Sequence, residues 1–345
     1  MVPTLSILVI THNQCGLIKR CLDSVLSQKL SVPFEIIVSD DRSSDGTDAF
    51  VEDLRNRVSG TVKNLVAFDY IRCNSDECHP ANTSERCGWN KLNAYLHAGG
   101  KYFVNVDADD YLRSDDIYQL QVDALEAHPE CSMCMQRSLF VNEGDPLENG
   151  RALPVNTVLE EGLVIPAEKF IIEDLRGVNP TYMIRRRPDD DMKALYGKWF
   201  DDTVITYHHL QYGPVVFVDR ADYVWVQHQS SISHTMSRDD DTILYGLLPL
   251  FHAWILPSFA KLFLQSGIPV INHALKVAPE YPSLSDQYRN YFAQFKGFIY
   301  RYYLSSRHGL LTKGRFWVSR ILLHLGIRFK FKSNFYLDLV SRSLI

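Results

Sequence analysis

The chain has 345 residues, of which 46% are hydrophobic and 22% are charged, a composition that excludes a disordered or fibrous protein. Its length predicts two domains, or one large domain with an appendage. The formal net charge of −5 excludes a generally basic nucleic-acid-binding protein, because binding phosphates needs a surplus of lysine and arginine. Seven cysteines are too few for a disulfide scaffold and indicate a reducing compartment.

The amino-terminal segment has no pattern of a targeting signal. Its apolar run, Leu5–Ile10, is too short for the hydrophobic region of a signal peptide, so we expect a cytoplasmic protein. The best candidate for a membrane span is Ile243–Leu264, but Pro249, Pro257 and Lys261 interrupt it. A buried or interfacial helix is the better interpretation of that stretch.

The first half of the sequence alternates between strand and helix patterns. Unbroken apolar runs typical of strands covered on both faces lie at Ser6–Ile10, Phe34–Val38, Val66–Ile71 and Tyr102–Val106. Helical patterns lie between them, at Leu17–Leu26, after a cap at Asp45 with Asp48 as capping-box partner, and at Trp89–Ala98. This alternation predicts an α/β fold with a doubly wound, mostly parallel sheet, in which ligands bind at the carboxyl ends of the strands.

The second half predicts a mixed continuation and then a helical region. Further elements are expected at Ile117–Ala127 (helix), Ser132–Phe140, Thr181–Arg186, Val215–Val218 and Ala221–Gln227 (strands), and near Asp201 (helix). The composition changes between Ser231 and Asp241. We therefore expect a catalytic domain over 1–235 and a helical, basic and aromatic region over 236–345.

Carboxylates gather where the predicted strands end. Asp40 and Asp41 follow the second strand, and Asp107, Asp109 and Asp110 follow the fourth. Acids at one edge repel each other unless a cation or hydrogen-bond donors compensate them. The Asp-x-Asp spacing puts two carboxylates on the same side of an extended segment, where they can bind one Mg²⁺ or Mn²⁺ that bridges a diphosphate. The alternative is that these acids form turns and cap helices.

Three blocks carry a resemblance to a known family. They are Ser6-Ile-Leu-Val-Ile-Thr-His-Asn13, Glu35-Ile-Ile-Val-Ser-Asp-Asp-Arg-Ser-Ser-Asp-Gly-Thr47 and Gly100-Lys-Tyr-Phe-Val-Asn-Val-Asp-Ala-Asp-Asp110. In order and spacing they closely resemble the family 2 glycosyltransferases of the GT-A fold. The resemblance covers roughly residues 4–235 and implies a GT-A catalytic domain that binds a nucleoside-diphosphate sugar.

The resemblance implies a set of nucleotide contacts in the first half of the chain. Asp40 matches the carboxylate that accepts a hydrogen bond from N3–H of uracil, and Thr11 and Asn13 match positions beside the base and ribose. Arg86 matches a basic residue that approaches the nucleotide, with Lys91 as the alternative. A solvated loop arginine is the other interpretation of Arg86.

The same resemblance implies a metal site and a catalytic base. Asp107 faces the ribose and the metal, Asp109 coordinates Mn²⁺ or Mg²⁺, and His228 adds a metal or phosphate contact. Asp202, at the start of a helix that precedes Gly213, matches the general base that deprotonates the acceptor hydroxyl. A helix cap is the other interpretation of Asp202.

Two positions depart from the family pattern. The first acid of the late pair is Asp201 instead of glutamate, and His208 stands where the family often has arginine. The departures put in doubt how the acceptor is held. The motif Gln-x-x-Arg-Trp of processive synthases is not evident in the sequence, so we expect transfer of a single sugar.

The resemblance therefore predicts an inverting, metal-dependent transferase that acts on a saccharide or lipid-linked saccharide in surface polysaccharide or glycoconjugate biosynthesis. UDP is the expected nucleotide. The alternatives are a non-catalytic nucleotide-sugar or glycan-binding module and a nucleotidyltransferase. Thr11–Arg20 contains a single glycine, Gly16, whereas a nucleotidyltransferase would normally want a glycine-rich, basic first loop to hold a triphosphate.

The cysteines offer a rival interpretation, a zinc site. Cys131 and Cys134 form a Cys-x-x-Cys pair, and Cys73, Cys78 and Cys87 lie near one another in sequence. The pair falls in an apolar strand pattern, and the other spacings match no compact zinc module. Buried free thiols are the favoured interpretation.

The tail differs in charge from the rest of the chain. Residues 285–345 contain 11 Lys and Arg against 2 Asp and Glu, and 14 of the 41 aromatic residues. An aromatic stripe at helical spacing is usually core. The density of cations suggests in addition a peripheral contact with the anionic inner face of a membrane.

Overall fold

The computed structural model describes residues 1–73, 83–154, 159–173, 175, 179–187, 202–229, 231, 249, 252–253, 256–260 and 262–263. The chain divides into two compact units, Met1–Thr235 and Met236–Ile345, and each is considered by itself. The predicted basic tail, 285–345, lies outside the described residues. Within the described part of the chain, the helices are too short or too polar to cross a membrane.

Four parallel strands form the part of the sheet that carries the motifs. The order along the sheet is β3-β2-β1-β4. In register, Thr11 lies beside Asp40 and Ile10 lies beside Asp107, so the carboxyl ends of three strands are neighbours. The predicted parallel arrangement is confirmed. The strand bounds are β1 (Leu5–Thr11), β2 (Phe34–Asp40), β3 (Leu65–Arg72) and β4 (Tyr102–Asp107).

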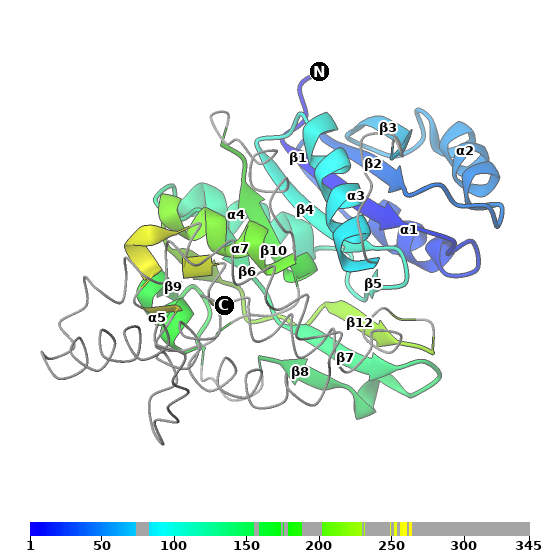
Figure 1. The fold of residues 1–345 in the computed structure, drawn as a ribbon. Coiled ribbons are helices and arrows are strands. Elements are labelled where there is room, and N and C mark those ends of the chain that lie inside the picture. The colour runs from blue at the N-terminus through cyan, green and yellow to red at the C-terminus, as the bar shows by residue number, and fades with distance from the viewer. Residues whose placement is uncertain are drawn as a thin grey trace, which may run out of the picture. The chain divides into compact units, whose positions relative to one another are not determined.

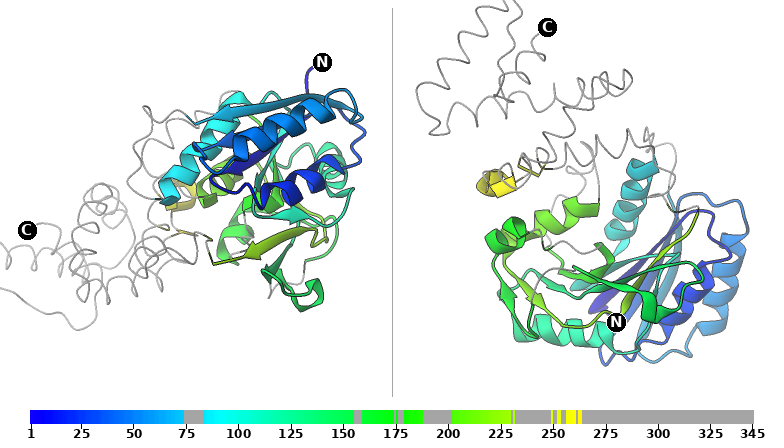
Figure 2. Two further views of the ribbon diagram at one scale, coloured as in Figure 1. Left: turned by 90° about the vertical axis from the view of Figure 1, so that its right-hand side faces the viewer. Right: turned by 90° about the horizontal axis from the view of Figure 1, so that it is seen from below.

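Helices cover both faces of this sheet (Figures 1 and 2). One face packs against α1 (Ile18–Leu26), α2 (Thr47–Val58) and α4 (Ile117–Ala127). The opposite face packs against α3 (Thr83–His97) and α7 (Asp202–His209). There the ring of Phe103 on β4 meets Tyr95 and His209 edge to face, with ring centroids 5.0 and 5.9 Å apart. The alternation of strand side chains explains both cores, since neighbouring residues point to opposite faces.

The remaining strands complete two sheets. Among the described residues, the main sheet has eight strands in the order β3-β2-β1-β4-β10-β6-β11-β9, and a second sheet has four in the order β5-β12-β7-β8. The second sheet begins directly after the carboxyl end of β4 (Figure 1). The further elements are β5 (Tyr111–Leu112), β6 (Met133–Met135), β7 (Ser138–Asn142), β8 (Arg151–Leu153), β9 (Val164–Ile165), α5 (Ala167–Ile172), β10 (Tyr182–Arg185), β11 (Val215–Phe217) and β12 (Tyr223–Gln227).

The single strand predicted over Ser132–Phe140 is wrong. The chain leaves the main sheet after β6 and enters the second sheet with β7. Between them, the N–H of Gln136 donates to the carbonyl of Thr181 at 3.2 Å, and that of Arg137 donates to the carbonyl of Arg220 at 2.8 Å. Tertiary partners decide this break, which an apolar run does not reveal.

The capping box predicted for α2 is also wrong. Gly46, with φ of 92°, occupies the cap position, one residue after Asp45. Asp45 Oδ1 instead accepts hydrogen bonds from the N–H and the hydroxyl of Thr47, at 3.1 and 2.6 Å. Asp48 accepts from the N–H of Ala49. Glycine suits this cap because the left-handed conformation is strained for other residues.

The Cys-x-x-Cys pair is buried. Cys131 and Cys134 have free thiols that are fully shielded from solvent. Burial raises the pKa of the Cys131 thiol to about 11 and raises the pKa of Cys134 further. Buried, protonated thiols are poor metal ligands, as the sequence interpretation expected.

Candidate functional site

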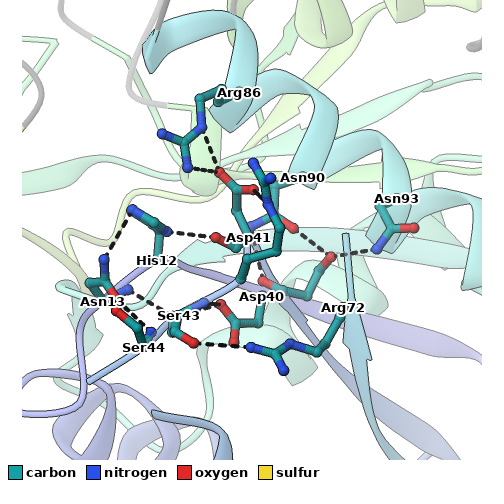
Figure 3. Close-up of polar contacts among 12 residues, drawn as sticks. His12, Asn13, Asp40, Asp41, Ser43, Ser44, Arg72, Arg86, Asn90 and Asn93 are labelled. Carbon is teal, nitrogen blue, oxygen red and sulfur yellow. Dashed lines mark hydrogen bonds and ion pairs between the residues drawn. The ribbon is translucent and has the colours of Figure 1, made fainter. Parts of the chain in front are cut away.

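The loops after β1 and β2 are joined to each other (Figure 3). Asn13 Oδ1 accepts a hydrogen bond from the N–H of Ser44 at 2.8 Å, and the N–H of Asn13 donates to Ser43 Oγ at 2.7 Å. Asn13 adopts φ of 51°, a left-handed conformation that asparagine tolerates better than most residues. These contacts give Asn13 a role in connecting the two loops, while Thr11 is almost fully buried beside it.

Asp40 lies where the sequence predicted, at the end of β2, and its carboxylate accepts hydrogen bonds from other residues of the protein. The side chain has no exposed surface. Oδ1 accepts from the N–H and the hydroxyl of Ser43 at 2.9 and 2.6 Å, and Oδ2 accepts from the Tyr70 hydroxyl at 2.5 Å. Burial and this hydrogen bond raise the pKa of Tyr70. Both oxygens of Asp40 thus already accept hydrogen bonds from the protein. The binding of a base by Asp40 stays a prediction.

Asp41 is the acid that sequence reasoning did not single out. Arg86 Nε and Nη2 approach its Oδ2 at 2.9 and 2.6 Å, and Arg42 Nε approaches Oδ1 at 3.3 Å. The Asp41 side chain is 9% exposed, whereas those of Arg86 and Arg42 are 33% and 45% exposed. Two cations therefore stand at the edge of the site around one carboxylate.

Helix α3 supplies polar side chains to the ends of β1 and β2 (Figure 3) and to the end of β4. Asn90 Nδ2 donates to the carbonyls of Thr11 and Ser39, both at 3.0 Å. Lys91 lies on the same helix with no exposed side-chain surface, and its Nζ is 3.3 Å from Asp107 Oδ1. Together with Arg86 on Asp41, these contacts join α3 to the ends of β1, β2 and β4. The signal in the sequence was a run of polar residues inside a buried helix face.

The structure brings Asp109 and His228 together from segments more than a hundred residues apart. His228 Nε2 lies 2.8 Å from Asp109 Oδ2, and their side chains are 6% and 18% exposed. Asp107, 30% exposed, lies two residues before Asp109 and contacts Lys91. Partly accessible carboxylate oxygens with an imidazole suit Mg²⁺ or Mn²⁺, so the residues present fit the predicted metal.

Asp110, the next acid of the motif, is buried. Burial raises the pKa of its carboxyl well above the usual range, and the negative charges of Asp109 and Asp107 raise it further. Burial and the same three acids also raise the pKa of Cys21, whose thiol faces the Asp107 carbonyl at 3.7 Å. Besides burial, the cause that the two shifts share is the charge of Asp107 and Asp109, which a bound cation would offset.

A second group of potential ligands lies away from this edge. Ligand atoms of His128, Glu130 and Cys131 lie within 4.8 Å of one another. The raised pKa of the Cys131 thiol opposes the thiolate form that a metal binds. The Arg185 guanidinium, which donates to the carbonyls of Cys131 and His128, adds a positive charge nearby. This cluster does not make a good metal site.

Asp202 is the first residue of α7, as predicted, but its side chain is outside the described part of the chain. Its role as general base stays a prediction. The glycine that follows the helix has a steric reason: Gly213 has φ of 154°, and a Cβ there would lie 2.2 Å from the carbonyl oxygen of Glu130. His208 is buried and contacts Gln211 at 3.0 Å.

Parallel strands in this order, with acids at the carboxyl ends of β2 and β4, agree with the GT-A type of domain that the sequence predicted. The sequence profile of Glycosyl transferase family 2 matches residues 6–179, about half of the chain. The chain therefore belongs to this family.

Individual proteins are also similar to this chain. The uncharacterized proteins Rv1520 of Mycobacterium tuberculosis and Mb1547 of Mycobacterium bovis are each 22% identical over 319 residues, which cover 83% of this chain and 83% of theirs. Among solved structures, S. aureus TarS 1–349 in complex with UDP is similar, with a TM-score of 0.55 and 17% identity over 85% of this chain and 80% of that chain. TarS in complex with UDP-GlcNAc gives a TM-score of 0.55 and 18% identity with the same coverage. The likeness shows the GT-A fold.

Proposed function

We propose that this family 2 glycosyltransferase is an inverting, metal-dependent enzyme. It moves one sugar from a nucleoside-diphosphate sugar to a hydroxyl of a saccharide or lipid-linked saccharide, in surface polysaccharide or glycoconjugate biosynthesis. The observation that carries the proposal is the contact between Asp109 and His228, at the same sheet edge as the acids that follow β2 and the arginines that contact them.

The donor is a UDP-sugar in this proposal. The bound UDP and UDP-GlcNAc of the TarS structures support this choice of nucleotide. The nucleoside lies between the ends of β1 and β2, beside Thr11 and the two acids Asp40 and Asp41. Arg86 is one-third exposed, so part of its guanidinium is accessible for a contact with the nucleotide.

Asp107, Asp109 and His228 hold Mn²⁺ or Mg²⁺. The ion, when bound, neutralises the charge that develops as the diphosphate leaves. Lys91 has no exposed surface, so it acts on Asp107 and not on the substrate. Its ammonium holds the Asp107 carboxylate in place at the end of β4.

Asp202 is the general base. Its carboxylate accepts the proton of the acceptor hydroxyl while that oxygen attacks the anomeric carbon. The bond from the anomeric carbon to the diphosphate oxygen breaks in the same step, and its electron pair leaves with UDP. The configuration at the anomeric carbon is thereby inverted.

The test is release of the donor's own nucleoside diphosphate, in the presence of Mn²⁺, from a panel of UDP-, GDP- and CDP-sugars. Asp109→Ala and Asp202→Asn should each lose activity, and rates equal to those of the unaltered protein in either variant would refute that residue's role. Asp53→Asn removes an exposed acid that pairs with Arg57 on α2 and serves as the matched control. UDP binding without turnover of any donor would favour the alternative, a binding module.

The basic tail is proposed to contact an anionic membrane surface, near the acceptor. Sedimentation of the full chain with vesicles that contain anionic lipid tests this. Failure to bind at moderate salt would overturn it without affecting the transferase proposal.

A further inference from the structure

Asp110 connects the motif loop to a distant strand. It is 3% exposed. Its Oδ1 accepts a hydrogen bond from the N–H of Val226 at 2.8 Å, and its Oδ2 accepts one from the Tyr223 hydroxyl at 2.5 Å. Both partners belong to β12, more than a hundred residues along the chain. The carboxylate is therefore committed to the protein and has no surface for a substrate.

Tyr223 contacts the same loop at a second point. Its hydroxyl oxygen accepts a hydrogen bond from the N–H of Asp107 at 3.4 Å while its hydrogen goes to Asp110. The ring is fully buried. One hydroxyl thus connects the backbone of Asp107 to the side chain of Asp110. Within the loop, the N–H of Asp110 donates a hydrogen bond to the carbonyl of Asp107 at 3.0 Å.

The backbone continues this connection. β5 follows the motif directly and pairs with β12, with Leu112 opposite Tyr223 and Tyr111 opposite Val224. His228 comes two residues after Val226, and its ring meets Asp109 at 2.8 Å. Asp109 therefore lies in the loop before β5, and His228 lies directly after β12. The hydrogen bonds of Asp110 with Tyr223 and Val226 join these two segments.

We propose that Asp110 and Tyr223 are positioning residues that hold Asp109 and His228 in register for the metal. The inference rests on the proposed function, because it takes Asp109 and His228 as ligands. Neither positioning residue touches the ion. Their hydrogen bonds fix the separation of two ligands that no short piece of chain connects, and partners of this kind change metal affinity by about 10–100-fold when removed.

The experiment measures Mn²⁺ binding by electron paramagnetic resonance of the free ion, with the full chain and a fixed concentration of UDP. Tyr223→Phe removes one hydroxyl and leaves the ring. We expect Mn²⁺ to bind about tenfold more weakly, and more weakly still in Asp110→Ala. The double variant should bind Mn²⁺ less weakly than the two separate losses multiplied together would give, since both changes break the contact between Asp110 and Tyr223.

The matched control is Tyr102→Phe. Tyr102 is also fully buried on β4, and its hydroxyl contacts Glu126 and Arg185 at 3.0 Å, at the opposite end of the strand. It should lower thermal stability by a similar amount and leave Mn²⁺ binding unchanged. A purely structural role for Tyr223 would give the same result as this control.

The outcomes separate the two proposals. Mn²⁺ binding that is unchanged in Tyr223→Phe and in folded Asp110→Ala would overturn the positioning role and leave the metal site intact. Absence of Mn²⁺ binding in the unaltered protein would overturn the metal site and the positioning role together. If Asp110→Ala does not fold, Tyr223→Phe against Tyr102→Phe decides the question.

Discussion

The carboxyl ends of β2 and β4 both carry clustered aspartates, and the two ends use them differently. At β2, Asp40 is completely buried and accepts three hydrogen bonds from the protein. At β4, Asp107 and Asp109 remain 30% and 18% exposed. Buried carboxylates with full sets of donors build a loop, whereas accessible ones remain able to bind a ligand. Acids that look alike in sequence thus divide into those that accept hydrogen bonds within the protein and those that remain accessible.

The largest expected effect is at the end of β4. Asp109→Asn removes a charged metal ligand, and we expect UDP release to fall about 10³-fold, since several kcal/mol of charge stabilisation are lost. Stability should change little because the side chain is partly exposed. Steady-state rates and thermal melts measure the two quantities. Near-normal rates in a folded variant would show that the ligands lie elsewhere.

The next effect is on stability, at the end of β2. Asp40→Asn cannot satisfy Ser43 and Tyr70 as the carboxylate does, and hydrogen bonds to buried charged groups are worth about 1.5–3 kcal/mol. We expect the free energy of unfolding, measured with urea, to fall by about 2 kcal/mol. The affinity for UDP should change less than in Asp41→Asn. If Asp40→Asn keeps its stability but loses UDP binding, Asp40 binds the base as the sequence suggested.

The comparison also marks what the sequence was able to predict. Apolar runs and the acids after them placed the four parallel strands, and the resemblance supplied Asp109 with His228, which the structure brings into contact. The sequence did not reveal that the carboxylate of Asp40 accepts a hydrogen bond from Tyr70 while that of Asp41 pairs with Arg86. These partners are 30 and 45 residues away along the chain.

Tertiary partners explain the other errors too. Nothing local in the apolar run from Ser132 to Phe140 marks the point where the chain changes sheets, since Thr181 and Arg220 supply the partners there. The roles of Asp110 and Tyr223 also depend on a contact across 113 residues. Local patterns predict elements, and long-range hydrogen bonds decide the function of each polar residue within them.

A smaller effect compares two cations of α3. Lys91 is fully buried against Asp107, whereas Arg86 is 33% exposed on Asp41. Lys91→Met should lower the free energy of unfolding by about 1–2 kcal/mol, less than for a pair buried on both sides, because water reaches the Asp107 left behind. Arg86→Met should lower it by under about 1 kcal/mol. Equal effects in urea titrations would contradict the distinction between a buried and an exposed pair.

The smallest effect concerns Asp45, the exposed acid of the β2 loop. Its carboxylate accepts from the N–H and hydroxyl of Thr47 and, through Oδ2, from the N–H of Cys15 at 2.9 Å. Partial burial acts to raise its pKa, but these hydrogen bonds outweigh it and the pKa is lowered. Asp45→Ala should therefore lower the free energy of unfolding by about 1 kcal/mol at pH 7, the net contribution typical of side-chain hydrogen bonds.

The pH dependence of the Asp45 effect follows from the sign of that shift. A lowered folded-state pKa means that the unfolded chain binds more protons, so the stabilisation is complete above the unfolded value of about 3.9 and is lost as the pH falls through the folded value. Urea titrations at pH 7, 5, 4 and 3 should show the difference between Asp45→Ala and the unaltered protein shrinking below about pH 4. Asp53→Ala, on helix α2 and paired at the surface with Arg57, should change stability by under about 0.5 kcal/mol. A difference for Asp45→Ala that stays constant with pH would mean that its carboxylate charge does not stabilise the loop.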